Sequence, residues 1–196
     1  ELPPVSEPVS GTRKKIGSLL RLLKNSRRPL LIGGHGVILA GARSAFKELA
    51  RRLDIPLQTS WNAVDLVEED FDGFFGRANS YGPRYPNFIV QNCDLLLSIG
   101  CRLGLQHTGF NARAFARGAK KVIVDIDQNE LRKFPVRPEL SFRTDAGVFI
   151  GCLLAEMKKA SFVPPDVGRW KVWCRERKAE YPVCGPEYYG DKKFVD

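Results

Sequence analysis

A glycine-rich turn early in the sequence has the residue types to bind an anion. Gly33, Gly34 and Gly36 directly follow the short apolar run Leu30–Ile32, which is typical of a strand buried on both faces. Glycine lets the backbone turn sharply, and a helix starting near Val37 would aim its free N–H groups back into that turn. A tight strand-to-helix turn without a ligand explains the same glycines, so both interpretations stay open.

A second turn and two acidic residues follow later strands. Arg102 lies just beyond the apolar strand predicted at residues 94–100, and Asp125 and Asp127 end the one predicted at 121–127. Glycine N–H groups and Arg102 suit a diphosphate, whereas Asp125 or Asp127 suits ribose hydroxyls or an adenine amino group. Both acids could equally cap the next helical turn, and Arg102 could be an ordinary surface charge.

Several familiar motifs are absent. Position 39 is Leu rather than the third glycine of a dinucleotide fingerprint, and Thr59-Ser60 stands where an acid would end the second strand. There is no GK[ST] phosphate loop. His35 and His107 have no Ser, Cys or acid placed by sequence to form a catalytic unit, which favours polar loop residues. The sequence therefore assigns no catalytic residue and no metal ligand.

Composition limits the class of protein. The 196 residues suit one domain with tails, and neither a run of eighteen apolar residues nor a signal-peptide core occurs. The five cysteines lack CxxC spacing, which argues against a disulfide framework or a zinc site. We therefore expect a soluble protein of the cytoplasm. The formal charge of +9 is scattered along the chain, which favours a solvated surface over a nucleic-acid or membrane partner.

The order of elements predicts the fold class. Strands are predicted at residues 30–32, 57–60, 73–76, 94–100, 121–127 and 140–143. Helices are predicted at residues 13–25, 42–53, 88–92, 112–118, 129–133, 146–157, with Asp145 as cap, and 166–181. This alternation predicts an α/β fold with a doubly wound, mostly parallel six-stranded sheet and helices on both faces, which is a Rossmann-like arrangement. We expect a linker at 1–12, a central domain at 13–160, and a C-terminal helix and linker at 161–196 that lead towards a missing domain.

Four sequence blocks together carry a family resemblance. In order, they are Pro29–Val37, Gly76–Asn87, Asn92–Arg102 and Val122–Lys133. They resemble the central domain of thiamine-diphosphate-dependent enzymes of the acetolactate synthase type, over roughly residues 13–160. Each block alone has little specificity, but their order is specific for the domain.

The resemblance implies a larger, three-domain enzyme that acts on 2-keto acids such as pyruvate, as a homodimer or homotetramer. Thiamine diphosphate and Mg²⁺ would be held by the first and third domains, so the present chain alone should be inactive. In some members the central domain binds FAD, and in others the same cleft holds ADP or nothing. Carried over by position, the residues along the FAD would be Gly33, Gly34, Gly36, Arg102, Asp125, Asp127 and Asp145. The chain departs from flavin-binding members at Leu103-Gly104-Leu105, where they have Phe-Asp-Asp.

Two other functions remain as alternatives. The chain could be a stand-alone nucleotide-binding module, and a complete reading frame ending at Asp196 would favour that interpretation. It could also be a basic nucleic-acid binder, which would bind with an affinity that falls steeply with salt.

Overall fold

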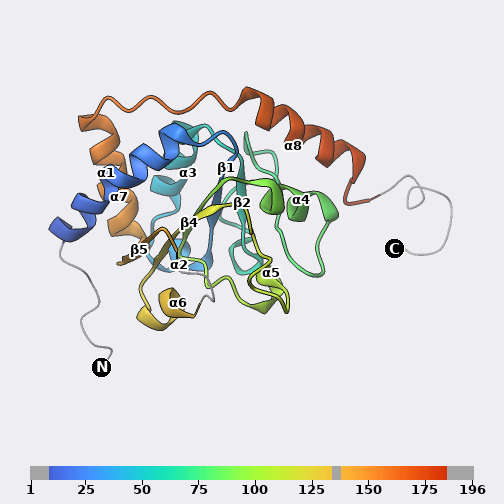
Figure 1. The fold of residues 1–196 in the computed structure, drawn as a ribbon, viewed down its shortest axis with the longest axis horizontal. Helices are drawn as coiled ribbons and strands as arrows, with labels where there is room; N and C mark the ends of the chain where they lie inside the picture. The colour runs from blue at the N-terminus through green and yellow to red at the C-terminus, as the bar shows by residue number, and fades with distance from the viewer. Residues whose placement is uncertain (1–8, 134–137, 185–196) are drawn as a thin grey trace.

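A computed structural model describes residues 9–133 and 138–184. Its strands are β1 (Pro29–Gly33), β2 (Leu57–Thr59), β3 (Leu95–Ile99), β4 (Lys120–Asp125) and β5 (Leu140–Arg143). They form one five-stranded sheet in the order β2-β1-β3-β4-β5, and every neighbouring pair is parallel (Figure 1). The chain order reverses between β1 and β3. In a doubly wound sheet, ligands bind at such a switch point, beyond the carboxyl ends of the strands.

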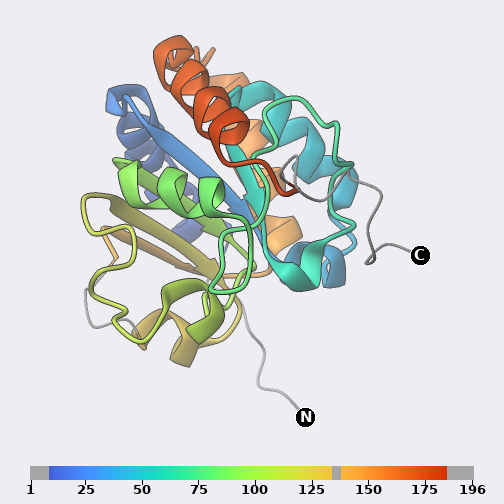
Figure 2. The same cartoon turned by 90° about the vertical axis from the view of Figure 1, so that its right-hand side faces the viewer.

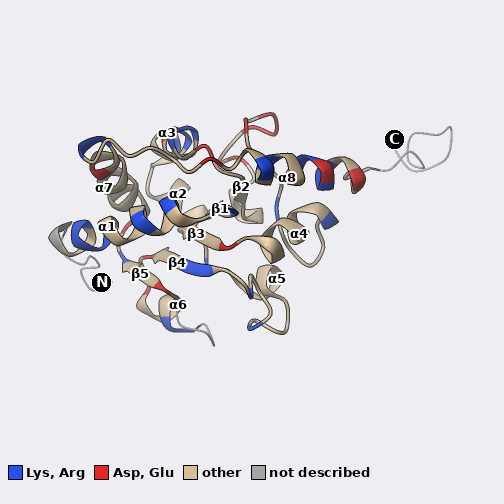
Figure 3. Ribbon diagram, turned by 45° about the horizontal axis from the view of Figure 1, so that its top comes forward, with Lys and Arg blue, Asp and Glu red and all other residues tan. Residues whose placement is uncertain are grey.

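Helices cover both faces of the sheet. They are α1 (Val9–Asn25), α2 (His35–Leu39), α3 (Arg43–Leu53), the 3₁₀ turn η1 (Trp61–Ala63), α4 (Arg84–Asn92), α5 (Leu105–Thr108), α6 (Gln128–Arg132), α7 (Ala146–Lys159) and α8 (Gly168–Glu180). Figure 3 shows α3 and α7 on one side of the sheet and α5 and α6 on the other. Because both faces are covered, β1, β2 and β3 are buried along their whole length. The predicted α/β fold is confirmed.

The strand predicted at residues 73–76, which would make the sheet six-stranded, is reduced to a single parallel bridge between Phe74 and Leu57. The Leu57 N–H donates to Gly73 O at 2.8 Å, and Phe75 N–H donates to Leu57 O at 2.7 Å. Gly73 and Gly76 both have positive φ, which interrupts the extended backbone on either side of the bridge. The segment therefore pairs beside β2, at one edge of the sheet, without forming a full strand.

The helix predicted at residues 112–118 is also wrong. These residues form turns, with Ala114 N–H donating to Asn111 O and Ala119 N–H to Ala116 O. Ala116 has a φ of 44°, a left-handed conformation that a right-handed helix cannot continue through. The helix of this connection is instead α5, which lies between Gly104 and Gly109 in the segment expected to be a loop.

The first helix begins earlier than expected. Residues 9–12 were expected to belong to an extended linker, but they form the first turn of α1. The buried stripe of the helix extends from Ile16, Leu19 and Leu23 back to Thr12, which is fully buried. Residues 1–8 of the predicted linker lie outside the described residues.

Helix α8 packs on the domain, although it was expected to lead out of it. The Trp170 Nε1–H donates to Pro29 O at 3.0 Å, at the start of β1, and Lys171 pairs with Asp54. The helix also packs against α4, and Figure 2 shows α8 (red) running alongside the rest of the fold. None of the described helices is long and apolar enough to cross a membrane.

Candidate functional site

A cleft of about 960 Å³ lies at the carboxyl edge of the sheet. Its walls are formed by the residues that follow all five strands, because parallel strands bring their carboxyl ends to the same edge. Predicted site residues from separate parts of the sequence meet in its walls, namely Gly36, Arg102, Asp125, Asp127 and Asp145. Gly33 and Gly34 are not among the residues that line it.

The turn that carries Gly34 and Gly36 lies in direct contact with the turn at Gly100, which follows β3. A Cβ on Gly34 would lie 2.1 Å from Gly100 O, and one on Gly36 would lie 2.9 Å from Gly100 Cα. Gly100 itself has a φ of 60°, a conformation that side chains with a Cβ rarely adopt. The Gly34 N–H donates to Ile99 O and the Gly36 N–H to Gly100 O, both at 2.9 Å. These two amides therefore hold the turns together and are not free for a phosphate.

Gly33 faces the core and not the cleft. A Cβ there would lie 2.5 Å from side-chain atoms of both Leu66 and Phe46. Phe46 belongs to α3, so this glycine allows the helix to approach the end of β1 closely. The first glycine cluster thus serves close packing at Gly33 and Gly34 and reaches the cleft only at Gly36.

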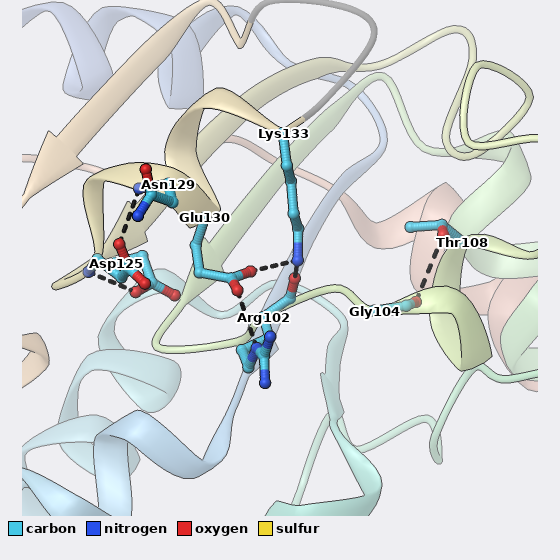
Figure 4. A network of polar contacts seen from close by, with 8 residues as sticks. Arg102, Gly104, Thr108, Asp125, Asn129, Glu130 and Lys133 are labelled. Carbon is cyan, nitrogen blue, oxygen red and sulfur yellow. Dashed lines mark hydrogen bonds and ion pairs between the residues drawn. The ribbon is translucent and has the colours of Figure 1, made fainter.

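Arg102 is the main positive charge in the cleft wall. Its side chain is 82% exposed, and its Nε–H donates to the Glu130 carboxylate at 2.9 Å. Lys133 pairs with the same carboxylate and also donates to the Arg102 carbonyl (Figure 4). The next residue, Leu103, is buried and has a φ of 45°, which is uncommon for a residue with a bulky side chain. Leu103 therefore anchors the loop while Arg102 faces outward.

Asp125 and Asp127 shape the turn from β4 into α6. The Asp127 N–H donates to Asp125 Oδ1 at 2.9 Å, and the Asn129 N–H donates to Asp127 Oδ1 at 2.8 Å. Asp127 is thus the N-cap of α6, as one of the two interpretations expected. Burial raises the pKa of Asp125, and the negative charges of Glu130 and Asp127 add to this effect.

Asp145 caps α7, as the sequence predicted. Its Oδ1 accepts hydrogen bonds from the N–H groups of Gly147 at 2.8 Å and Val148 at 3.1 Å. The preceding residue, Thr144, also lines the cleft and is almost completely buried, and its Oγ1 has no hydrogen-bond partner among the described residues. The end of β5 therefore presents a carboxylate and a hydroxyl group beside the cleft.

The two histidines follow β1 and β3, the two strands that flank the switch point. The His35 Nδ1–H donates to Asn62 O at 2.6 Å, so it links α2 to η1. The His107 side chain is largely buried in the cleft wall, and its Nε2 has no partner among the described residues. Burial lowers the pKa of His107 and raises that of Cys101, which also lines the cleft, to about 11, so both groups are neutral at pH 7.

The sequence interpretation missed the apolar part of the cleft. Large exposed apolar side chains, Leu39, Trp61, Leu105 and Ile126, line it together with the predicted polar residues. Trp61 directly follows the Thr59-Ser60 end of the second strand. The rule that ligands bind beyond strand ends could have found it, but an isolated aromatic residue in a predicted loop has no specific pattern.

Within residues 9–133 and 138–184, no three side chains of His, Cys, Asp or Glu gather so that they could hold a metal ion. The acids of the cleft are distributed along its wall, and their Oδ1 atoms bind backbone N–H groups.

Curated relatives of this chain are acetolactate synthase large subunits. That of Porphyra purpurea is 29% identical over 187 residues, which cover 94% of this chain and 31% of the relative. The probable large subunit of Methanocaldococcus jannaschii is 32% identical over 157 residues, covering 80% and 26%. That of Corynebacterium glutamicum is 29% identical over 188 residues, covering 96% and 29%. The chain thus spans about a third or less of the length of these relatives.

A family match agrees with the fold and with these relatives. The family described as the central domain of thiamine pyrophosphate enzymes matches residues 16–153, from within α1 to within α7. The match therefore includes every strand of the sheet and every loop that lines the cleft. This chain belongs to the family of thiamine pyrophosphate enzyme central domains.

Proposed function

We propose that this chain is the central domain of an acetolactate-synthase-like enzyme that uses thiamine diphosphate to join or decarboxylate 2-keto acids such as pyruvate. We further propose that its cleft binds FAD or ADP. The family match and the acetolactate synthase relatives support the first part. The second part depends mainly on one observation, which is that Gly36, Arg102, Asp125, Asp127 and Asp145 line a single cleft.

The cleft has the charges and volume to fit a nucleotide. About 960 Å³ is within the range of ligand-binding pockets and large enough for a dinucleotide. The exposed guanidinium of Arg102 can bind a diphosphate with charge-assisted hydrogen bonds. Asp125, Asp127 and Asp145 each use Oδ1 for backbone hydrogen bonds, and none of the described contacts uses Oδ2. These oxygens can accept hydrogen bonds from ribose hydroxyls.

The proposal assigns this domain a binding and scaffolding role. Thiamine diphosphate, when bound, stabilises a carbanion, and it needs an oxygen-coordinated metal ion for its diphosphate. Because the chain spans 31% of the length of a relative, we place thiamine diphosphate and Mg²⁺ on other parts of the full-length protein. That protein would be a homodimer or homotetramer.

Calorimetric titration of the purified 196-residue chain with FAD and with ADP tests the nucleotide site. We expect saturable binding of at least one of them, and we expect Arg102→Gln to weaken it about tenfold because a phosphate contact is lost. Asp145→Asn tests the charge of a second proposed site residue. Asparagine caps a helix as well as aspartate does, so this variant removes only the charge. If neither FAD nor ADP binds at millimolar concentration, the proposed nucleotide site is contradicted.

The full-length protein tests the activity. We expect it to consume pyruvate only when both thiamine diphosphate and Mg²⁺ are present, and light scattering should give the mass of a dimer or tetramer. The 196-residue chain assayed alongside should consume none. Pyruvate consumption that does not depend on thiamine diphosphate would contradict the proposed chemistry.

A further inference from the structure

Trp61 differs from the other two tryptophans in having an exposed indole. Trp170 is 4% exposed and donates to Pro29 O, and Trp173 stacks on it with ring centroids 5.0 Å apart. Trp61 is 51% exposed and lines the cleft. No hydrogen bond or ring contact within the described part of the chain involves its indole. Its position is therefore unexplained by the packing of the fold.

The backbone that carries Trp61 is firmly held. The Ser60 N–H donates to Gly33 O at 2.9 Å, which continues the pairing of β2 with β1 up to the tryptophan. On the other side, the His35 Nδ1–H donates to Asn62 O at 2.6 Å and ties η1 to α2. Because the backbone is fixed on both sides of Trp61, a ligand that binds there need only order the indole side chain and not the loop.

The cleft is lined by both apolar and charged side chains. Leu39, on α2, is 77% exposed and lines the cleft with Trp61, and α2 packs against η1. The loops after β4 and β5 contribute carboxylates, from Asp125 and Asp145, while Arg102 comes from the loop after β3. A ligand that fits this lining has a planar apolar ring as well as charged or hydroxyl groups.

We propose that Trp61 is the stacking residue of the cleft and that the planar ring of a bound nucleotide lies against its indole. This inference rests on the proposed nucleotide site and adds to it the residue that holds the ring. Aromatic side chains stack on planar heteroaromatic rings with little dependence on their identity. The ring is therefore the flavin of FAD or the adenine of ADP, with the phosphates towards Arg102.

Tryptophan fluorescence tests this directly. We expect ADP to quench part of the emission of the 196-residue chain, and we expect Trp61→Phe to remove that quenching while the signal of Trp170 and Trp173 remains. FAD should quench less in Trp61→Phe than in the parent chain, because the flavin still quenches the other two tryptophans by energy transfer. In calorimetry, Trp61→Ala should weaken binding about tenfold, which is the usual effect of losing one ring stack. Val64→Ala is the matched control, because Val64 is 58% exposed on the same loop and does not line the cleft. Its affinity should equal that of the parent chain.

The outcomes separate this inference from the function it rests on. Weaker binding of ADP by Trp61→Ala, together with ADP quenching that Trp61→Phe removes, supports stacking of the adenine; weaker binding of FAD alone by Trp61→Ala supports stacking of the flavin. Binding of both nucleotides that is unchanged in Trp61→Ala overturns the stacking role and leaves the nucleotide site standing. If neither nucleotide binds, both proposals are overturned. Thermal melts of each variant, with Trp61→Phe as the conservative change, show that any loss is not unfolding.

Discussion

At the scale of single residues, Gly34 has the least room for a side chain among the described glycines. A Cβ there would lie 2.1 Å from Gly100 O and 2.4 Å from Cys101 Cα, which are backbone atoms that cannot rotate away. We expect Gly34→Ala to lower the free energy of unfolding by about 3 kcal/mol, since overpacking forces the two turns apart. Urea denaturation measures the change.

Gly17 provides the control for Gly34. A Cβ on Gly17 would meet nothing within 4 Å, and the residue lies inside α1. We expect Gly17→Ala to stabilise the protein by up to about 1 kcal/mol, because alanine has a higher helix propensity than glycine. Equal stability changes in the two variants would show that the turns do not depend on close contact.

His107 gives the fold a pH dependence of known sign. Burial lowers its pKa, so the folded state binds fewer protons than the unfolded state as the pH falls through the ordinary histidine range. Protonation therefore favours unfolding, and we expect the free energy of unfolding to decrease from pH 7 to pH 5. The decrease should be smaller in His107→Gln, as measured by urea denaturation at each pH.

The contribution of Asp125 to the pH dependence of stability must be separated from that of His107. Burial raises its pKa, so the folded state holds its proton more tightly, and its contribution falls as the pH rises through the folded-state pKa. The sign is opposite to that of His107. Because Asp125 is present in both proteins, its contribution cancels in the comparison of wild type with His107→Gln. Identical pH profiles for the two proteins would contradict the assignment.

At the scale of elements, α8 behaves as part of the domain. Its Trp170 fills a buried site and donates to Pro29 O, and on its opposite side Val172 is 48% exposed. We expect Trp170→Ala to cost about 4 kcal/mol of stability, because burial, stacking and a hydrogen bond are lost together. Val172→Ala should change stability by less than about 0.5 kcal/mol. If Trp170→Ala melts at the same temperature as the parent chain, α8 does not stabilise the domain.

At the scale of the whole molecule, the net charge of +9 is spread over the surface. Figure 3 shows Lys and Arg on α1, α3, α7 and α8. Several of the cations pair with acids, as in Arg43 with Asp65, Lys47 with Glu68 and Arg77 with Glu69. A nucleic-acid site would instead need a continuous basic surface.

A binding measurement checks this distribution of charge. We expect the fluorescence anisotropy of a labelled DNA duplex to show no binding by the chain at physiological salt, at protein concentrations up to about 10 µM. The same duplex in low salt serves as the comparison, because scattered charges bind weakly there. Micromolar binding at physiological salt, with a steep decrease as salt rises, would favour the nucleic-acid alternative.

The sequence by itself determined the five strands, most of the helices and their order. The apolar runs at β1, β3 and β4 are long enough to be read as buried strands, and their alternation with helices requires a parallel sheet. The acid that caps α7 could be read directly, because Asp145 immediately precedes the apolar helix pattern. These signals are local or periodic, so they can be recognised without any knowledge of tertiary contacts.

Only the tertiary structure decided what the glycines and the loops do. Gly33 could be assigned to packing only once Phe46 and Leu66 were placed beside it, and the amides of Gly34 and Gly36 only once the second glycine turn lay against them. Trp61 became a candidate because its ring stays exposed in the cleft. Such facts depend on contacts between residues far apart in the chain, and no local pattern of residues encodes them.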